Sequence, residues 1–311
     1  MSPQFFAKQV PKQLSQELMQ EPIQEPIQEL TQQFCHQGAV AVHLDDNSNL
    51  QLALQSESGI SEAVVAKQFS KAANKYDNEA HIQREIAQAG LNNLPNALHG
   101  ELLDIGCATG THSDTLRQRG ANVMGLDIAP GMVHRAQARF PYVDFKQGSA
   151  QSLPFESSSF SSVFSSMALQ WCNSPQSVAS EIYRVLKPSG MAEIAIMVSG
   201  SFAELHKARS IAQLPAAVTS LPEAQLWLNS FLGAGLRVSR LINRDYVDEH
   251  QDVLSLLRSI KNVGAGATGA KQQSLSRSDI KKLSLAYKNI SAVDGVLPLT
   301  YKVCHFRLEK P

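Results

Sequence analysis

The chain of 311 residues carries 28 basic and 28 acidic side chains, so its formal net charge is zero. A neutral chain has no global basic field with which to hold nucleic acid or an anionic membrane. The four cysteines form no C-x-x-C pair, which argues against a zinc site or a disulfide framework. No leader-like segment opens the chain and no apolar run approaches the ~18 residues of a membrane span, so we expect a cytoplasmic protein.

Residues 1–62 differ in composition from the rest of the chain. They are rich in glutamine, contain the repeat QEPIQEPIQEL, and place Pro22 and Pro26 where either would interrupt a helix. Acidic residues outnumber basic ones there. We predict a poorly ordered acidic extension with a short strand pair in AVAVHL and LQLAL; a docking segment is the alternative. Residues 63–311 then form the main domain.

Apolar residues recur at helical spacing over residues 64–91, and a linker follows at 92–100. Strands and helices alternate beyond the linker. The expected order is ELLDI, a helix after Thr111, NVMGLD, a helix over 132–140, VDFKQG, SVFSSMAL, a helix over 181–186, and GMAEIAIMV. This alternation predicts a parallel sheet with helices on both faces and a ligand site at the carboxyl ends of its strands.

The pattern after residue 198 is mostly helical. Helices are expected at 202–211, 222–232, 253–261 and 276–288, together with a strand-like LRVSRLI and a terminal strand at about 298–309. We expect the two strands to complete the sheet as an antiparallel pair. The helices of residues 199–290 would cover the strand ends as a lid.

The segment LLDIGCATG runs from a buried strand into a tight turn. It has Gly106 and Gly110 but lacks the G-x-G-x-x-G that parks a dinucleotide pyrophosphate. Asp104 precedes the turn, where it can orient the backbone or meet an ammonium group, and Asp127 ends the next strand, where it can accept both ribose hydroxyls. Two acids at successive strand ends suit a cationic nucleoside such as S-adenosylmethionine. The alternative is that both acids are caps.

The third strand unit supports a nucleoside site. GSAQSLPF places Ser149 at the strand end, where its side-chain oxygen can meet an adenine amino group. The backbone N–H of Ala150 can reach the same ring.

These stretches, with EIYRVLKPSG, resemble the successive motifs of class I S-adenosylmethionine-dependent methyltransferases over residues 101–198. The resemblance implies an α/β Rossmann-like fold, with a mostly parallel seven-stranded sheet, helices on both faces and a helical lid. It also implies S-adenosylmethionine as cofactor, no metal, and a set of binding residues spread over the motifs: Asp104, Gly106, Cys107, Gly110, Asp127, Ile128, Ser149, Ala150 and Ser166. Tyr76, which lies before these motifs, can cover the methionine end of the cofactor.

Two positions depart from that family's pattern. Ala108 stands where a middle glycine is usual, and alanine leaves the loop possible if its φ is negative. Ser149 stands where an aspartate is usual, which weakens the contact to adenine without removing it.

A second set of stretches resembles the malonyl-acyl-carrier-protein O-methyltransferase family of biotin synthesis, from about residue 65 to 310. They are FSKAANKYDNEAHIQR, ALQWC, SGSFAELHKA, LLRSIKNVGA, LSRSDIKKL and PLTY. The resemblance implies esterification of the free carboxyl of a malonyl thioester, which primes pimelate synthesis. Three alternatives stay open: malonyl-coenzyme A as the thioester, a methyltransferase for another small acceptor such as a quinone precursor, and a non-catalytic S-adenosylmethionine binder.

A malonyl carboxylate is ionised at pH 7, so the transfer needs positioning rather than a general base. Arg258 and Lys261 lie three residues apart and can hold that carboxylate from one helical face. Four further side chains can line the acceptor site: Tyr76, Gln170, Trp171 and Tyr301. Solvated surface charge is the alternative for the two cations, and plain packing is the alternative for Trp171 and Tyr301.

Basic residues also gather in the expected lid. Between residues 255 and 290 there is one acidic residue, Asp279, and there are seven basic residues: Arg258, Lys261, Lys271, Arg277, Lys281, Lys282 and Lys288. Acyl carrier proteins are acidic, so we hypothesise that this region docks the carrier, with a solvated charged face as the alternative.

Overall fold

The computed structural model describes residues 61–215, 221–265, 275–291 and 295–311. The predicted strand pair and nearly all of the predicted extension lie outside these ranges, so the division at residue 62 stays a prediction. Within them, no helix combines the length and the apolar character that a membrane crossing requires.

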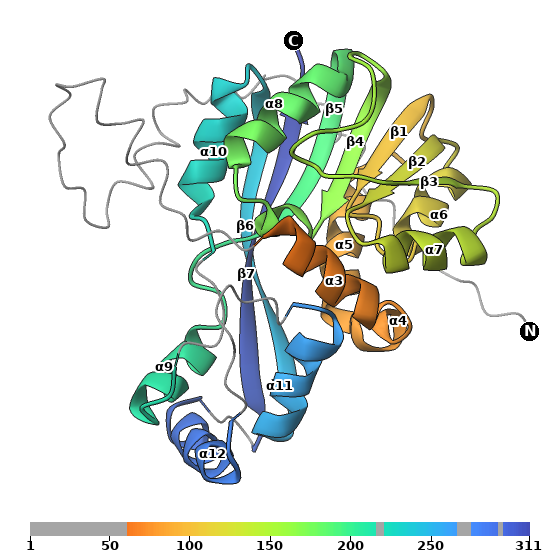
Figure 1. Ribbon diagram of the computed structural model, residues 1–311. Helices are drawn as coiled ribbons and strands as arrows, with labels where there is room; N and C mark the ends of the chain where they lie inside the picture. The colour runs from red at the N-terminus through yellow and green to blue at the C-terminus, as the bar shows by residue number, and fades with distance from the viewer. Residues whose placement is uncertain (1–60, 216–220, 266–274, 292–294) are drawn as a thin grey trace, which may run out of the picture. The chain divides into compact units, whose positions relative to one another are not determined.

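The described strands form one seven-stranded sheet in the order β3-β2-β1-β4-β5-β7-β6 (Figure 1). Only β7 runs antiparallel to its neighbours, as the sequence predicted for the end of the sheet. The strands are β1 (Glu101–Ile105), β2 (Asn122–Asp127), β3 (Asp144–Gln147), β4 (Phe160–Ser166), β5 (Leu186–Met197), β6 (Arg237–His250) and β7 (Leu297–Glu309).

Helices cover both faces of this sheet. On one face, α8 (Pro175–Val185) and α10 (Ala224–Gly233) bury Ile182 and Trp227 against the strands. On the other face, α5 (His81–Asn93), α6 (Thr111–Gln118) and α7 (Pro130–Arg139) bury Leu91, Leu116 and Val133. The mostly parallel, doubly covered sheet that the sequence predicted is confirmed.

The paired strands β6 and β7 reach beyond the rest of the sheet. β5 pairs with β7 only from Val303 onward, whereas β6 pairs with β7 along its whole length. The protruding half is covered by α9 (Ala203–Ile211), α11 (Val253–Asn262) and α12 (Arg277–Ser291), which form a second core with it (Figure 1). Three of the four helices predicted for the lid lie in this substructure, which we call the lid. The fourth, predicted at 222–232, is α10, which packs on the sheet face instead. That the lid covers the strand ends stays a prediction.

β6 is twice as long as the strand-like LRVSRLI from which it was predicted. Its second half, NRDYVDEH, buries the alternate residues Tyr246, Asp248 and His250. Buried and exposed residues alternate here, as in a half-buried strand. Because two of the three buried residues are polar, a search for alternating apolar residues does not detect this part of the strand.

The helical pattern of residues 64–91 is split into α3 (Glu62–Ala72), α4 (Tyr76–Glu79) and α5. No glycine or proline marks the break. Tertiary contacts hold it instead: Asp77 Oδ1 accepts hydrogen bonds from Arg139 Nη1 at 2.9 Å and from Thr109 Oγ1 at 2.6 Å. The short helix α4 is thereby tied to the glycine loop, and Tyr76 stands beside it.

Helix α3 crosses α7 at a single glycine. The backbone N–H of Gly131 donates to Ser70 Oγ at 3.1 Å, and a Cβ on Gly131 would lie 2.8 Å from Ser70 Cα. Only glycine permits this approach, so the crossing fixes how closely α3 lies to the loops at the strand ends.

We expect Gly131→Ala to lower the free energy of unfolding by about 2 kcal/mol, since the added methyl must push two backbones apart. Gly233→Ala is the matched control, because its Cβ would meet nothing closer than 3.7 Å and alanine favours the helix. Urea denaturation of both variants measures the difference. Equal stability of the two variants would contradict the assigned crossing.

Candidate active site

The glycine loop joins β1 to α6, and both of its glycines are required by its backbone. Gly106 has a φ of +76°, and a Cβ there would lie 2.1 Å from Ala168 Cβ. Gly110 has a φ of +83°, and its Cβ would lie 2.7 Å from the Phe145 ring. Gly106 faces the cavities described below, whereas Gly110 packs against the core and lines none of them.

Ala108 adopts a left-handed conformation, with a φ of +47°. The condition under which alanine fits this loop without strain, a negative φ, is therefore not met. For an L-residue other than glycine this conformation costs about 1 kcal/mol. The strain is held by a hydrogen bond from the Ala108 N–H to Asp127 Oδ2 at 2.9 Å.

Asp127 holds two backbone segments at once. Its other oxygen, Oδ1, accepts from the N–H of Ala129, which precedes α7, at 2.8 Å. A carboxylate has about four acceptor positions, so two remain for a ligand. Burial raises the pKa of Asp127 to about 6, although the two backbone N–H groups oppose the rise. The N-cap of α7 is Ala129, so Asp127 is not the helix cap that the sequence offered as the alternative; it holds the turn before the helix instead.

Asp104 is the second buried acid at these strand ends, with 2% of its surface exposed. Its Oδ2 accepts from Ser113 Oγ at 2.6 Å. Burial raises the pKa of Asp104 to about 7, and the nearby charge of Asp127 adds to the rise. Burial and Arg84 lower the pKa of His112 to about 4, so this neighbouring imidazole is neutral at pH 7. Two acids with little compensating charge favour a cationic ligand.

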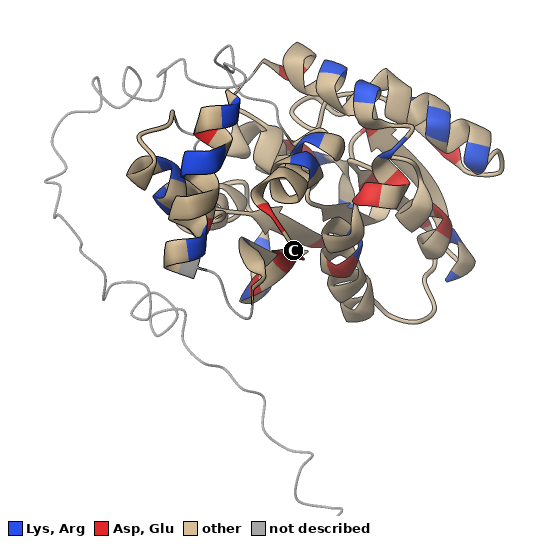
Figure 2. Cartoon of the chain, turned by 90° about the horizontal axis from the view of Figure 1, so that it is seen from below, with Lys and Arg blue, Asp and Glu red and all other residues tan. Residues whose placement is uncertain are grey.

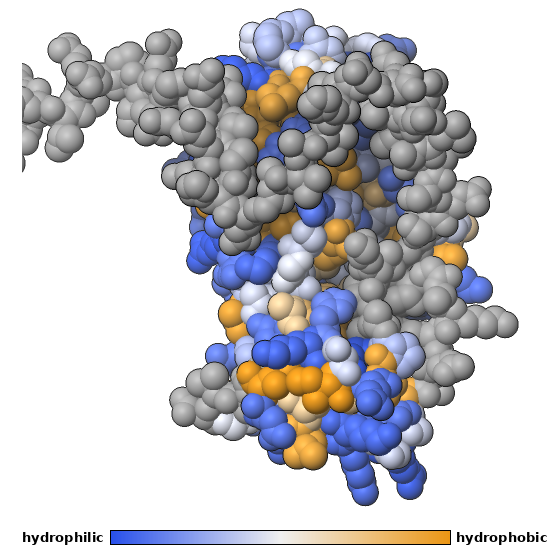
Figure 3. Space-filling model, turned by 90° about the vertical axis from the view of Figure 1, so that its left-hand side faces the viewer, coloured by the Kyte–Doolittle hydropathy of each residue, from blue (hydrophilic) through white to orange (hydrophobic). Residues whose placement is uncertain are grey.

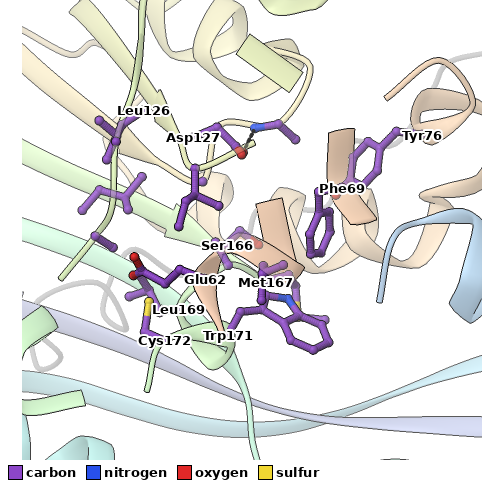
Figure 4. Close-up of a pocket in the computed structure, with 18 residues that line it drawn as sticks. Glu62, Phe69, Tyr76, Leu126, Asp127, Ser166, Met167, Leu169, Trp171 and Cys172 are labelled. Atoms are coloured by element: carbon purple, nitrogen blue, oxygen red, sulfur yellow. Dashed lines mark hydrogen bonds between the residues drawn. The ribbon is translucent and has the colours of Figure 1, made fainter. Parts of the chain in front are cut away.

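Two cavities meet at the glycine loop. The first, about 690 Å³ with its open mouth, lies on the Asp127 side (Figure 4) and has apolar walls that include Ile128, Ala150 and Leu169. The second lies on the Asp104 side and includes Cys107 and His112. Both cavities are lined by the same four residues at their junction: Tyr76, Gly106, Ala108 and Ser166.

The structure therefore brings together eight of the ten residues predicted to bind the cofactor: Tyr76, Asp104, Gly106, Cys107, Asp127, Ile128, Ala150 and Ser166. Gly110, at the end of the loop, packs against Phe145 and lines neither cavity. Ser149 lies beside the first cavity, where its hydroxyl donates to Glu62 Oε1 at 2.5 Å.

The residues fit S-adenosylmethionine. Ser166 Oγ is buried at the junction and has no hydrogen-bond partner among the described residues, so a polar ligand group would satisfy it. An apolar slot next to Asp127 matches an adenosine, and the Asp104 side matches an ammonium group. Among the described residues, no group of three or more His, Cys, Asp and Glu side chains is placed to hold a metal ion.

A third cavity adjoins the first and contains four of the side chains predicted for the acceptor: Tyr76, Gln170, Trp171 and Tyr301. Trp171 packs edge-on against Phe69 with ring centroids 5.9 Å apart, and Tyr301 packs edge-on against Phe202 at 4.7 Å. Gln170 Nε2 donates to the Met167 carbonyl at 2.8 Å, and its Oε1 is buried without a partner among the described residues.

Arg258 and Lys261 are exposed on α11 and line none of the three cavities. Their contact with a substrate carboxylate stays a prediction.

The strand expected over SVFSSMAL ends at Ser166, and the chain turns at Met167, whose φ is +56°. Residues Leu169–Trp171 then form a short 3-10 helix. This turn places Met167 in the wall shared by the first and third cavities. The sequence predictions of site residues also omitted Glu62, Phe69, Met197 and Phe202. Of these, Phe69 and Phe202 lie in predicted helices and in the stretches FSKAANKYDNEAHIQR and SGSFAELHKA that carry the family resemblance, and Met197 lies in the predicted strand GMAEIAIMV, but nothing local marked them as site residues.

The sheet order, the strained glycine loop and the acid at the end of β2 define a class I methyltransferase. The family described as "Methyltransferase domain" matches residues 103–194. Solved structures with the same fold include a candidate methyltransferase of Bacillus halodurans, with a TM-score of 0.52 and 17% identity over 75% of this chain and 99% of that one. The YcgJ protein of Bacillus subtilis has a TM-score of 0.50 and 16% identity over 74% of this chain and 98% of that one.

Relatives narrow the class further. A malonyl-[acyl-carrier protein] O-methyltransferase of Herminiimonas arsenicoxydans is 32% identical over 246 residues, which is 78% of this chain and 94% of that protein. The biotin biosynthesis bifunctional protein BioHC of Cellvibrio japonicus is 33% identical over 88% of this chain and 56% of that protein. The chain belongs to the malonyl-[acyl-carrier protein] O-methyltransferase family.

We expect Ala108→Gly to raise the free energy of unfolding by about 1 kcal/mol, because glycine removes the left-handed strain. Gly106→Ala should lower it by about 2 kcal/mol or more, because the methyl overlaps Ala168 in a strained backbone. Chemical denaturation measures both. The strain assigned to Ala108 is refuted if its glycine variant is no more stable than the parent.

Proposed function

We propose that the protein transfers a methyl group from S-adenosylmethionine to the free carboxylate of malonyl-acyl-carrier protein. The product is the malonyl methyl ester that primes pimelate synthesis for biotin. The observation that carries the proposal is the junction of the first and third cavities, which share four wall residues, Phe69, Tyr76, Met167 and Trp171. Family membership supports the choice of acceptor.

Methyl transfer to a carboxylate requires only that the two reacting groups are positioned and that water is excluded from the site. S-adenosylmethionine, when bound, supplies an electrophilic methyl group on a sulfonium, and a malonyl carboxylate is already ionised at pH 7. Joining an anion to a cation removes charge, so a poorly hydrated site favours the transfer. The aromatic edges of Phe69, Trp171 and Phe202 provide such walls around the third cavity.

The polar groups of the third cavity can orient the acceptor. Burial raises the pKa of Tyr301, with the charge of Asp248 adding to the rise, so its hydroxyl keeps its proton and can donate. Burial raises the pKa of Tyr76 in the same way, with Asp127 adding to the rise. Since Arg258 and Lys261 are exposed outside the cavities, neutral donors of this kind would hold the carboxylate during transfer.

The lid supplies a surface that suits an acidic carrier. On α12, Arg277, Lys281, Lys282 and Lys288 are exposed; Figure 2 colours basic residues blue. Leu285 lies at helical spacing from the last three of these residues and is 64% exposed. Figure 3 shows hydrophobic residues among hydrophilic ones at the lower end of the molecule, where α9 and α12 lie in Figure 1. An apolar centre with a basic rim matches a small acidic partner. Arg258 is exposed on the neighbouring α11, and Lys271 lies outside the described residues. Action on a carrier protein also agrees with the expected cytoplasmic location.

Malonyl, acetyl and succinyl thioesters of acyl carrier protein, offered with methyl-labelled S-adenosylmethionine, test the function. Malonyl should be esterified, acetyl should not, because it has no free carboxylate, and succinyl should react at least ~10-fold more slowly because it is one methylene longer. Asp127→Ala should lose cofactor binding and serves as the negative control. Cofactor binding without transfer to malonyl would indicate another acceptor or a non-catalytic protein.

Lys281→Glu with Lys282→Glu should raise the KM for malonyl-acyl-carrier protein by ~10-fold or more at low salt, because like charges now face each other. The difference from wild type should shrink as salt rises. Malonyl-coenzyme A, used as a carrier-free substrate, is the control and should be affected less. An unchanged KM for the carrier substrate at low salt rules out this docking face.

A further inference from the structure

Glu62 is an acid that none of the recognised motifs contains. It is the first residue of α3, it is half-buried, and it lines the first cavity beside Leu169 and Cys172 (Figure 4). An acid half-buried in an otherwise apolar wall calls for a partner.

One oxygen of the Glu62 carboxylate is held in place. Oε1 accepts from Ser149 Oγ and from Gln151 Nε2, each at 2.5 Å. Gln151 is itself fixed, because its Oε1 accepts from the Ser174 N–H at 2.7 Å. The other oxygen of Glu62, Oε2, makes no hydrogen bond with the described residues. The carboxylate is therefore oriented by the protein and keeps one oxygen for a ligand.

Two acids stand apart in the wall of the first cavity. Asp127, at the end of β2, is one, and Glu62 is the other (Figure 4). Ile128, Ala150 and Leu169 line the same cavity. A nucleoside whose ribose lies at Asp127 can therefore place its base against these apolar walls with its edge toward Glu62. Adenine presents an exocyclic amino group, a hydrogen-bond donor, and a carboxylate is an acceptor only.

Ser149 explains why the acid comes from α3. The class I methyltransferases that this chain resembles usually carry an aspartate at this position, and a serine hydroxyl is a weaker acceptor. Here the hydroxyl donates to Glu62 and so anchors a carboxylate delivered by another element. We propose that Glu62, held by Ser149 and Gln151, receives the adenine amino group and sets the preference for adenine. This inference rests on the proposed use of S-adenosylmethionine.

Binding calorimetry with S-adenosylhomocysteine and its 6-oxo counterpart, S-inosylhomocysteine, tests the proposal without turnover. The wild type should prefer the adenine compound, because the 6-oxo oxygen would face a carboxylate. Glu62→Gln should weaken S-adenosylhomocysteine binding by ~10-fold and reduce the preference ratio by a similar factor, since an amide can donate to the oxo group. Thermal unfolding of each variant checks that the fold is retained.

Two further variants sharpen the result. Glu156→Gln makes the same charge change at an exposed residue that lines none of the cavities, and should keep the wild-type ratio. Ser149→Asp added to Glu62→Gln should restore the preference, because a carboxylate returns to the same side of the first cavity. A wild-type ratio in Glu62→Gln, or no recovery in the double variant, overturns the role of Glu62. Failure of the wild type to bind S-adenosylhomocysteine at all would instead overturn the proposed function.

Discussion

The carboxylate of Asp127 is the interaction on which the site depends. It lies at the end of β2, is almost fully buried, and accepts hydrogen bonds from the backbone on both sides of the ligand space, at Ala108 and at Ala129. Ala108 is strained, and this carboxylate keeps it in place. Burying an acid is unfavourable, as the raised pKa of Asp127 shows. The same residue therefore shapes the loop and, under the proposed function, would favour a cationic ligand, whose charge would offset that cost.

The third cavity, proposed for the methyl acceptor, is lined by residues from two different parts of the fold. The protruding half of β6 and β7 forms its own core with α9, α11 and α12, and contributes Tyr301 to the third cavity. The parallel part of the sheet contributes Met167 and Trp171, which follow β4. The third cavity is therefore lined from two parts of the fold, the protruding strands and the chain that follows β4.

The strands, the lid helices and the acids at β1 and β2 could be predicted because each depends on the spacing of residues that are close in the sequence. Asp104 and Asp127 follow apolar runs, and parallel strands end at one edge of a sheet. The features that could not be predicted depend on distant contacts. The φ of Ala108 is set through Asp127, the break before Tyr76 through Arg139, and the approach of Glu62 through the crossing of α3 over α7. No spacing rule along the chain contains that information.

The close contact between Gly131 and Ser70 has a further consequence. Ser70 follows Phe69 on α3, and Phe69 lines both the first and the third cavity, while Glu62 at the start of the same helix lines the first. The helix is thus held near its end by Gly131 and at its start by Ser149 and Gln151. Any displacement of α3 would therefore alter the walls of both cavities at once.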